Sequence, residues 1–448
     1  MNAKRILAML FAVLMVAGCL TACGGNGGTT EPAGTNPAGT TGAATEVNVV
    51  PWSAEDIALI GEDIKAEANG KTVTLKLWQP EAAQDVFKKQ VADFQEIFKD
   101  YADIQIEVAI QGENDAATAV LADAKTAADV FGFPSDQMLK LAKEQLAPVY
   151  FPNEVTSMNS AESVAAATYN GKLMAYPEVG DNSYFLCYDK TLVTDEQAKS
   201  LEAIFEACKA NNKRFILDSG NGFFSCLYLY TGGVITEGLE DDGETQKFND
   251  YDIDKAAATV QAFGELFKKY EANFQSSASD TVIDGFKNGT TAAGVIGSWN
   301  VAAAKETLGE NAGFAILPTI NVGGTDTPTI NMFGYKFIGV NAQSAFPKTA
   351  QALAYYLTNE ECQLYRAEQL EWGPSNTNVA NSEFVKNNAS MTAILAQSAN
   401  SVPQTGIAGP FWDACAALGT YVAEAKSDFS TEAAKAEVEN CIAAIKGE

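Results

Sequence analysis

Hydrophobic positions alternate with polar ones, or recur every three to four residues, along most of the chain. Residues 72–78 alternate with the period of a strand, and residues 83–99 carry apolar side chains at helical spacing. A strand over 104–110, a helix over 116–126 and a strand over 129–133 follow in the same way. This β-α-β-α-β order predicts a largely parallel sheet, with ligand-binding residues beyond the carboxyl ends of its strands.

Two of these predicted strands end in an aromatic residue, and an acidic residue follows three positions later. Trp78 and Glu81 come at the end of the first strand, and Phe133 and Asp136 at the end of the third. The carboxyl ends of parallel strands meet at one edge of a sheet, so we expect these four side chains near a ligand. A place in the core is the competing interpretation for Trp78, and helix capping for Asp136.

The middle of the chain predicts a second α/β lobe. Asn170-Gly171 is typical of a tight hairpin turn, and Pro177 is expected to stop the strand that follows it, where the chain changes direction. The elements expected after it are strands over 184–188, 215–217, 292–296 and 314–317, and helices over 196–211, 251–270 and 279–288. A strand over 335–340 and a helix over 346–358 then indicate a return to the first lobe.

The first 22 residues have the pattern of an export signal. Lys4 and Arg5 precede an apolar run that is too short to span a bilayer. Leu20-Thr21-Ala22-Cys23 resembles the lipobox of bacterial lipoproteins, which implies a lipid on Cys23; Cys19 is a second candidate, and an ordinary secretory signal is the alternative. Residues 23–46, rich in Gly, Thr, Ala and Pro, are expected to form a flexible tether.

Residues 47–70 predict one further helix before the first strand. Ser53-x-x-Asp56 fits a capping box, and three isoleucines follow on one helical face. We therefore expect a short amphipathic helix there.

Charge and composition exclude several function classes. The chain has 57 acidic and 30 basic residues, a net charge of −27, so phosphate backbones repel it and nucleic acid is not an expected partner. It contains no histidine, which excludes Ser-His-Asp and Cys-His nucleophiles and the usual zinc ligand sets. No cofactor is expected.

The remaining chemistry-bearing residues favour structural roles. Asp250-x-Asp252-x-Asp254 lacks the turn glycine and later glutamate of a calcium loop, so helix capping is expected instead. Beyond the signal and Cys23 there are six cysteines with no metal-ligand spacing, and we expect buried free thiols, although export permits disulfides. These are Cys187, Cys208, Cys226, Cys362, Cys415 and Cys441.

Five segments together resemble family-one extracellular solute-binding proteins of ABC importers, and among them the maltose and maltodextrin-binding lipoproteins of Gram-positive bacteria. They are YNGKLMAYPEVGDNSYFLCYDKTLV (169–193), AGVIGSWN (293–300), FAILPTI (314–320), WGPSN (372–376) and GPFWDAC (409–415). The resemblance implies an α/β, two-lobed periplasmic-binding-protein type II fold with a ligand cleft between the lobes. Residues 71–178 and 320–372 are expected in lobe 1, and residues 179–319 and 373–448 in lobe 2.

The resemblance also implies a carbohydrate site. Phe133 and Asp136 follow the strand whose counterpart in the family supplies a stacking aromatic residue and an acid for sugar hydroxyls. Trp299 and Trp412 match two further stacking tryptophans, and Asp181 with Asn182 matches a hinge carboxylate. Phe223 stands where maltose binders commonly have a Glu-Pro-Tyr aromatic subsite, which leaves chain-length preference open. Trp372, in a loop with Gly and Pro, either lines the cleft or packs under it. The full set of expected ligand-binding residues is Trp78, Glu81, Phe133, Asp136, Asp181, Asn182, Tyr184, Phe223, Trp299, Trp372, Trp412 and Asp413.

The function that the resemblance implies is binding without chemistry. A monomeric, lipid-anchored protein on the outer face of the cell membrane would bind malto-oligosaccharides and deliver them to a permease. A binder of xylo- or galacto-oligosaccharides, or of another solute, is the first alternative. A cell-surface glycoside hydrolase is the second, because paired catalytic carboxylates are hard to recognise in so acidic a chain.

Overall fold

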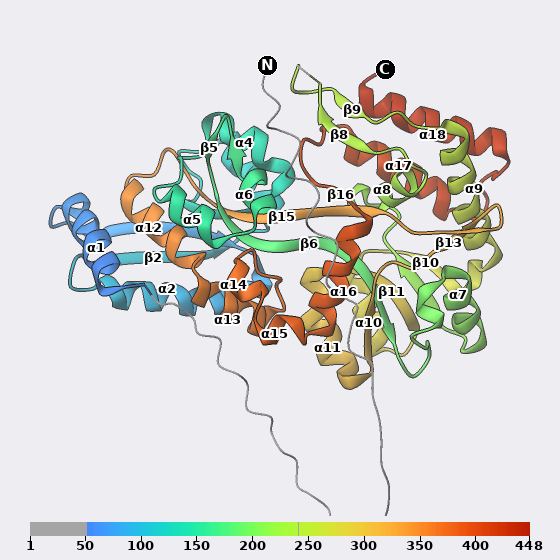
Figure 1. Cartoon of the computed structure of the whole chain (residues 1–448), viewed down its shortest axis with the longest axis horizontal. Helices are drawn as coiled ribbons and strands as arrows, with labels where there is room; N and C mark the ends of the chain where they lie inside the picture. The colour runs from blue at the N-terminus through green and yellow to red at the C-terminus, as the bar shows by residue number, and fades with distance from the viewer. Residues whose placement is uncertain (1–51, 241) are drawn as a thin grey trace, which may run out of the picture. The chain divides into compact units, whose positions relative to one another are not determined.

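The computed structural model describes residues 52–240 and 242–448 (Figure 1). Within them, ten strands form one mixed sheet, in which β6 (Tyr176–Asp189) lies beside β15 (Asn331–Val340) at the centre. Beyond β15 come β3 (Val130–Pro134), β1 (Val73–Gln79) and β2 (Ile104–Ile110); beyond β6 come β11 (Thr291–Gly297), β7 (Arg214–Leu217) and β10 (Phe274–Ser276). β12 (Ala312–Ala315) also pairs with β6, and β16 (Ser401–Pro403) with β15.

The first three strands and the helices between them confirm the predicted parallel arrangement. β1 pairs in parallel with β2 along its whole length, and with β3 at Leu77 and Trp78. α2 (Gln84–Phe98) lies where the helical spacing predicts it. α3 (Glu113–Ala122) is shifted toward the N-terminus of the predicted 116–126, because the backbone is extended at Gly112 before it and at Asp123 after it.

β6 continues through Pro177, so the prediction that this proline ends a strand is wrong. Pro177 faces Phe337 of β15 where the antiparallel register shifts, and there the ladder of backbone hydrogen bonds is already irregular. A missing N–H donor is tolerated at such a position. One continuous strand therefore carries the chain from the first lobe into the second.

The second lobe contains the predicted elements, with one correction. The helix expected over 196–211 is interrupted at Ser200, whose side chain caps α7 (Leu201–Ala210) by accepting the N–H of Ala203. The other elements of this lobe are α8 (Gly222–Thr231), β8 (Thr236–Leu239), β9 (Gln246–Phe248), α9 (Ile253–Lys269), α10 (Asp280–Lys287), α11 (Val301–Leu308), β13 (Ile320–Val322), β14 (Thr325–Thr327), α17 (Phe411–Ala423) and α18 (Thr431–Lys446).

Each lobe has its own large hydrophobic cluster. Leu77 and Leu353 belong to the cluster of the first lobe, and Leu186 to that of the second. Ile320 and Met332 also pack in the second cluster, so the chain returns to the first lobe along β15. The helices that follow or flank β3 and β15 are α4 (Met138–Glu144), α5 (Pro152–Met158), α6 (Ala161–Ala166), α12 (Pro347–Leu357), α13 (Glu360–Leu370), α14 (Thr377–Ala380), α15 (Glu383–Lys386) and α16 (Ala389–Gln397).

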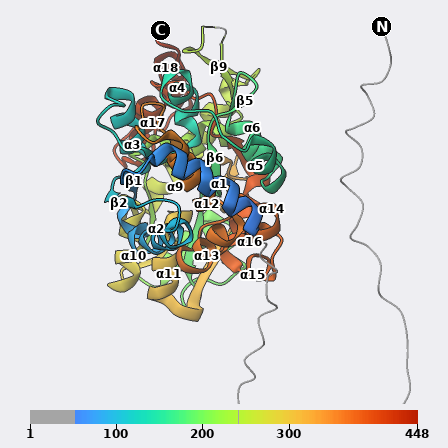
Figure 2. The ribbon, with the colours of Figure 1, turned by 90° about the vertical axis from the view of Figure 1, so that its left-hand side faces the viewer.

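The predicted N-terminal helix is confirmed as α1 (Ala54–Ala68). Ser53 Oγ accepts the N–H of Asp56 at 3.1 Å, and the Asp56 carboxylate accepts the N–H of Ser53 at 3.2 Å, which completes a capping box. Figure 2 shows α1 lying across the first lobe near α12. Glu67 of α1 accepts the N–H of Lys348 at 2.7 Å and that of Thr349 at 2.9 Å, so it satisfies donors at the start of α12.

Two local predictions are also confirmed. Asn170 and Gly171 have φ of 50° and 73°, and they join β4 (Thr168–Tyr169) to β5 (Lys172–Leu173). The six cysteines of the described residues are buried free thiols, and burial raises the pKa of Cys226 to about 12. The expected signal peptide, lipidation site and tether lie outside the described residues. In the part of the chain that the structure describes, no helix is both long and apolar enough to cross a membrane.

Candidate functional site

Asp181 lies on β6 where this strand passes between the two lobes, and its carboxylate is almost fully buried. Oδ2 accepts the N–H of Gly373 at 2.8 Å, whereas Oδ1 has no hydrogen-bond partner among the described residues. A Cβ at position 373 would lie 2.3 Å from Oδ2, so only glycine permits this approach. Burial raises the pKa of Asp181 to about 6, opposed by the Gly373 N–H, by the positive charge of Lys336 and by the nearby Ser298 hydroxyl. Asp181 thus has one buried acceptor that the protein leaves unused.

Asn182 and Asp136 are brought together through Gln404, a residue that the sequence did not indicate. Asn182 Nδ2 donates to Gln404 Oε1 at 2.7 Å, and Gln404 Nε2 donates to Asp136 Oδ1 at 3.1 Å. Gln137 Nε2 donates to Asp136 Oδ2 at 2.6 Å. Burial raises the pKa of Asp136 to about 6, opposed by the Gln137 bond. Both Asp136 oxygens are therefore engaged by the protein, unlike those of Asp181.

Three of the predicted aromatic residues project from the second lobe and remain half-buried. Phe223 is the second residue of α8, Trp299 follows β11, and Trp412 lies in the first turn of α17. The ring centroids of Phe223 and Trp299 are 6.1 Å apart. A Cβ at Gly222 would lie 2.1 Å from the carbonyl oxygen of Trp412, so glycine there lets the starts of α8 and α17 approach closely. These partly exposed rings are available to an apolar ligand surface.

Phe133 and Tyr184 are fully buried, which argues against their predicted contacts with a ligand. The Phe133 ring packs 5.7 Å from that of Phe337, because β3 is a central strand covered on both faces. The Tyr184 hydroxyl donates to the carbonyl of Phe224 at 3.1 Å in the core of the second lobe. In this structure both side chains serve the core.

The other predicted residues occupy varied positions. Trp78 is half-buried at the end of β1, and Glu81 and Asp413 are exposed. Trp372 is 7% exposed and packs 6.4 Å from Phe87 in the cluster of the first lobe. Of its two interpretations, packing under the cleft is the one that this position favours.

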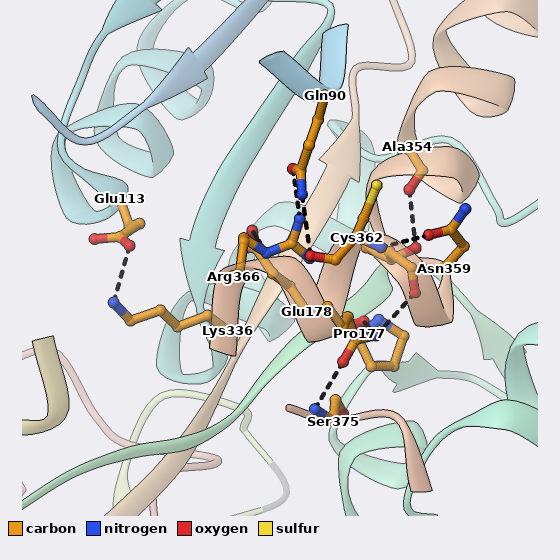
Figure 3. A network of polar contacts seen from close by, with 12 residues as sticks. Gln90, Glu113, Pro177, Glu178, Lys336, Ala354, Asn359, Cys362, Arg366 and Ser375 are labelled. Atoms are coloured by element: carbon orange, nitrogen blue, oxygen red, sulfur yellow. Dashed lines mark hydrogen bonds and ion pairs between the residues drawn. The ribbon is translucent and has the colours of Figure 1, made fainter. Parts of the chain in front are cut away.

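A buried ion pair, which sequence reasoning missed, lies between two of these tryptophans. Lys336 Nζ of β15 is 2.9 Å from Glu113 Oε1 at the start of α3 (Figure 3). The same ammonium lies 5.6 Å from the ring centroid of Trp299 and 5.1 Å from that of Trp372. A lone lysine inside an otherwise apolar strand was the available signal in the sequence.

A second buried pair of opposite charges, Arg366 and Glu178, lies on α13 and β6. Arg366 of α13 lies 3.8 Å from Glu178 of β6, and Gln90 Oε1 accepts a hydrogen bond from Arg366 Nη1 at 2.9 Å (Figure 3). Burial raises the pKa of Glu178 to about 7 and lowers that of Arg366, and each charge opposes the shift of the other. The pair places opposite charges of α13 and β6 side by side, while Glu178 Oε1 and Arg366 Nη2 have no hydrogen-bond partner among the described residues.

Comparison of the sequence with models of protein families assigns the chain to a family. The family model described as bacterial extracellular solute-binding protein matches residues 89–393. The chain belongs to this family. A search of curated proteins finds no match.

Solved structures share the fold of this solute-binding protein. A structure solved with acarbose is 26% identical, with a TM-score of 0.74 over 84% of this chain and 99% of that one. The maltodextrin-binding protein of L. casei BL23 is 23% identical, with a TM-score of 0.68 over the same shares. The maltotriose-binding protein of Thermus thermophilus is 17% identical, with a TM-score of 0.69 over 83% of this chain and 99% of that one. The maltose-binding-protein-like fold expected from the sequence is confirmed.

This solute-binding protein also has a pocket of about 760 Å³ between α4 and residues 405–410. Asp136 is the predicted site residue that lines it. Among the described residues, no group of three acidic or cysteine side chains is arranged to hold a metal ion. Asp252 caps α9 by accepting the N–H of Asp254 at 2.9 Å, which confirms the capping interpretation of the acidic triplet.

Proposed function

We propose that this protein is the substrate-binding component of a carbohydrate ABC importer and that it binds malto-oligosaccharides between its lobes. The observation that carries the proposal is the buried, unpartnered Oδ1 of Asp181, on the strand that joins the lobes. A buried acceptor without a partner costs about 1–3 kcal/mol, and a ligand hydroxyl offsets that cost. Closure over the ligand would then be driven by contacts made only in the closed state.

The chemistry of a pyranose fits the side chains at this place. Its edge carries hydroxyl groups and its faces carry C–H groups, so it needs polar acceptors and flat aromatic rings. Asp181 offers the acceptor, and Trp299, Trp412 and Phe223 offer half-buried rings. By analogy with aromatic pairs, each stacked ring contributes about 0.5–1.5 kcal/mol beyond its buried area. A few such contacts suffice for micromolar affinity, about −8.2 kcal/mol.

The similar solved structures support an α-glucan as the ligand. They include the structure solved with acarbose and the maltodextrin- and maltotriose-binding proteins described above. We propose further that the protein returns its ligand chemically unchanged and passes it to permease subunits. The anchor would be a lipid on Cys23, followed by the tether of residues 23–46.

Calorimetry of residues 47–448, which include every described residue, tests the ligand. The titrants are maltose, maltotriose, longer maltodextrins, xylo-oligosaccharides and lactose. We expect micromolar affinity for the α-glucans alone, and chromatography should recover each sugar intact. Binding confined to xylo-oligosaccharides or lactose would reassign the sugar. Release of shorter sugars would show that the protein is a glycoside hydrolase instead of a binding protein. No binding to any sugar would reject the carbohydrate proposal.

Metabolic labelling with a palmitate analogue tests the anchor. The full-length chain should acquire label, Cys23→Ala should not, and Cys19→Ala should label like the unaltered chain. An unlabelled, freely released protein would instead indicate an ordinary secretory signal.

A further inference from the structure

Lys336 has hydrogen-bonding capacity that the protein leaves unused. Its side chain is 8% exposed, and within residues 52–240 and 242–448 its ammonium makes one hydrogen bond, to Glu113. An ammonium has three N–H donors. The rings of Trp299 and Trp372 lie beside the ammonium and attract its charge without accepting a conventional hydrogen bond. Two N–H donors of the Lys336 ammonium therefore remain without a hydrogen-bond acceptor among the described residues, in a buried position.

The unused acceptor of Asp181 complements these donors. Asp181 is 6% exposed and lies on β6 beside Lys336 of β15, because the ladder between these strands pairs Lys336 with Val179 and Gly334 with Asn182. The Lys336 ammonium contacts the ring of Trp372, and the next residue, Gly373, donates its N–H to Asp181. A sugar hydroxyl both donates and accepts a hydrogen bond. One hydroxyl, or two on neighbouring carbons, can therefore donate to Asp181 Oδ1 and accept from Lys336 Nζ.

We propose that Lys336 is a ligand-binding residue, and that it acts with Asp181 on the same hydroxyl groups of the bound sugar. This inference rests on the proposed function. Glu113 neutralises the ammonium and fixes its position, so the site offers donors without a net positive charge. Glu113 is paired with Lys336 and Glu178 with Arg366, so the carboxylate of Asp181 is the charge left over, and it would repel an acidic sugar. The ligand class is therefore a neutral oligosaccharide.

Lys336→Met tests the inference, with Lys305→Met as the matched control. Lys305 also pairs with a carboxylate, at 2.8 Å from Glu371, and lies 5.8 Å from the ring centroid of Phe314. Calorimetry with maltotriose should show at least tenfold weaker binding for Lys336→Met and a change below twofold for Lys305→Met. Thermal unfolding followed by circular dichroism checks that each variant folds. If Lys336→Met does not fold, Lys336→Gln takes its place, with the same tenfold loss expected.

A double-mutant cycle with Asp181→Asn separates a shared ligand contact from an independent effect. Because both side chains are proposed to act on the same hydroxyls, the combined variant should lose less affinity than the two single losses together. Unchanged or tighter binding by the Lys336 variant, or strictly additive losses, would overturn the inference and leave the proposed function intact. Absence of α-glucan binding by the unaltered protein would reject the proposed function, and this inference with it.

Discussion

The N–H of Gly373 donates to Asp181 Oδ2 at 2.8 Å, and the carbonyl of Gly373 accepts the N–H of Gly180 at 2.8 Å. These contacts join the loop after α13 to β6 where this strand passes between the lobes. Oδ2 of the Asp181 carboxylate therefore holds the loop in place, whereas Oδ1 has no hydrogen-bond partner among the described residues. A ligand that uses the unpartnered oxygen contacts the connection between the lobes directly.

Asp181→Asn should weaken binding of maltotriose about 10- to 100-fold, because it removes the charge of a hydrogen-bond acceptor worth about 1.5–3 kcal/mol. Calorimetry measures the change. Asp284→Asn, on the exposed face of α10, is the control and should bind normally. Equal affinity of the Asp181 and Asp284 variants would show that the ligand does not use this carboxylate.

Binding should weaken as the pH falls below about 6. Burial raises the pKa of Asp181 to about 6, so at lower pH the carboxyl becomes protonated and accepts hydrogen bonds less strongly. Calorimetry from pH 7.5 to pH 5 should show a progressive loss of affinity, and Asp181→Asn should show a smaller dependence on pH. The same slope in the variant would assign the titration to another group.

Trp299→Ala and Trp412→Ala should each weaken binding of α-glucans by about tenfold or more. Each loses a stacking contact of about 0.5–1.5 kcal/mol and the apolar area buried with it. Tyr150, an exposed aromatic residue of the first lobe, provides the control Tyr150→Ala. If neither tryptophan variant differs from this control in a calorimetric titration, the sugar does not stack on these rings.

Phe133→Ala should act on stability and spare the affinity of the folded protein. Its fully buried ring packs against Phe131 and Phe337, and removing such a ring costs about 3–5 kcal/mol. Urea unfolding measures the free energy, and calorimetry below the transition measures binding. Normal stability with lost binding would instead favour the stacking role expected from the sequence.

Glu178 should make the protein more stable as the pH falls from 7 toward 4.5. Its pKa is about 7 in the folded chain against an ordinary 4.5, so the folded chain binds the extra proton in this range. The contribution of this proton to the free energy of unfolding is complete below about pH 4.5 and is lost as the pH rises through 7. The free energy of unfolding changes with a slope of at most about 1.4 kcal/mol per pH unit. Urea unfolding at several pH values should show a shallower slope for Glu178→Gln. An unchanged slope would mean that Glu178 stays ionised beside Arg366.

Local sequence patterns were sufficient for much of the fold. The capping box of α1, the hairpin at Asn170-Gly171 and the parallel strands β1 to β3 follow from short-range spacing. Pro177 shows the limit of such rules. Its effect depends on the register of β15, far away in the sequence, and a local breaker signal does not contain that register.

The site was less accessible from sequence because its contacts are long-range. Lys336 and Glu113 are 223 positions apart, and Gln404 reaches Asp136 across 268 positions. Phe133 matched a stacking position, yet burial on both faces of β3 places it in the core. The residue type at the end of a strand indicates where a side chain lies in the fold. Whether that side chain is exposed depends on which residues, distant in the sequence, pack against it.

A crystal structure of residues 47–448 grown with maltotriose tests the central claim most directly. We expect a sugar between the lobes, with one ring stacked on Trp299 and a hydroxyl within hydrogen-bonding distance of Asp181 Oδ1. A sugar bound elsewhere on the surface, or one that leaves Asp181 Oδ1 without a partner, would contradict it.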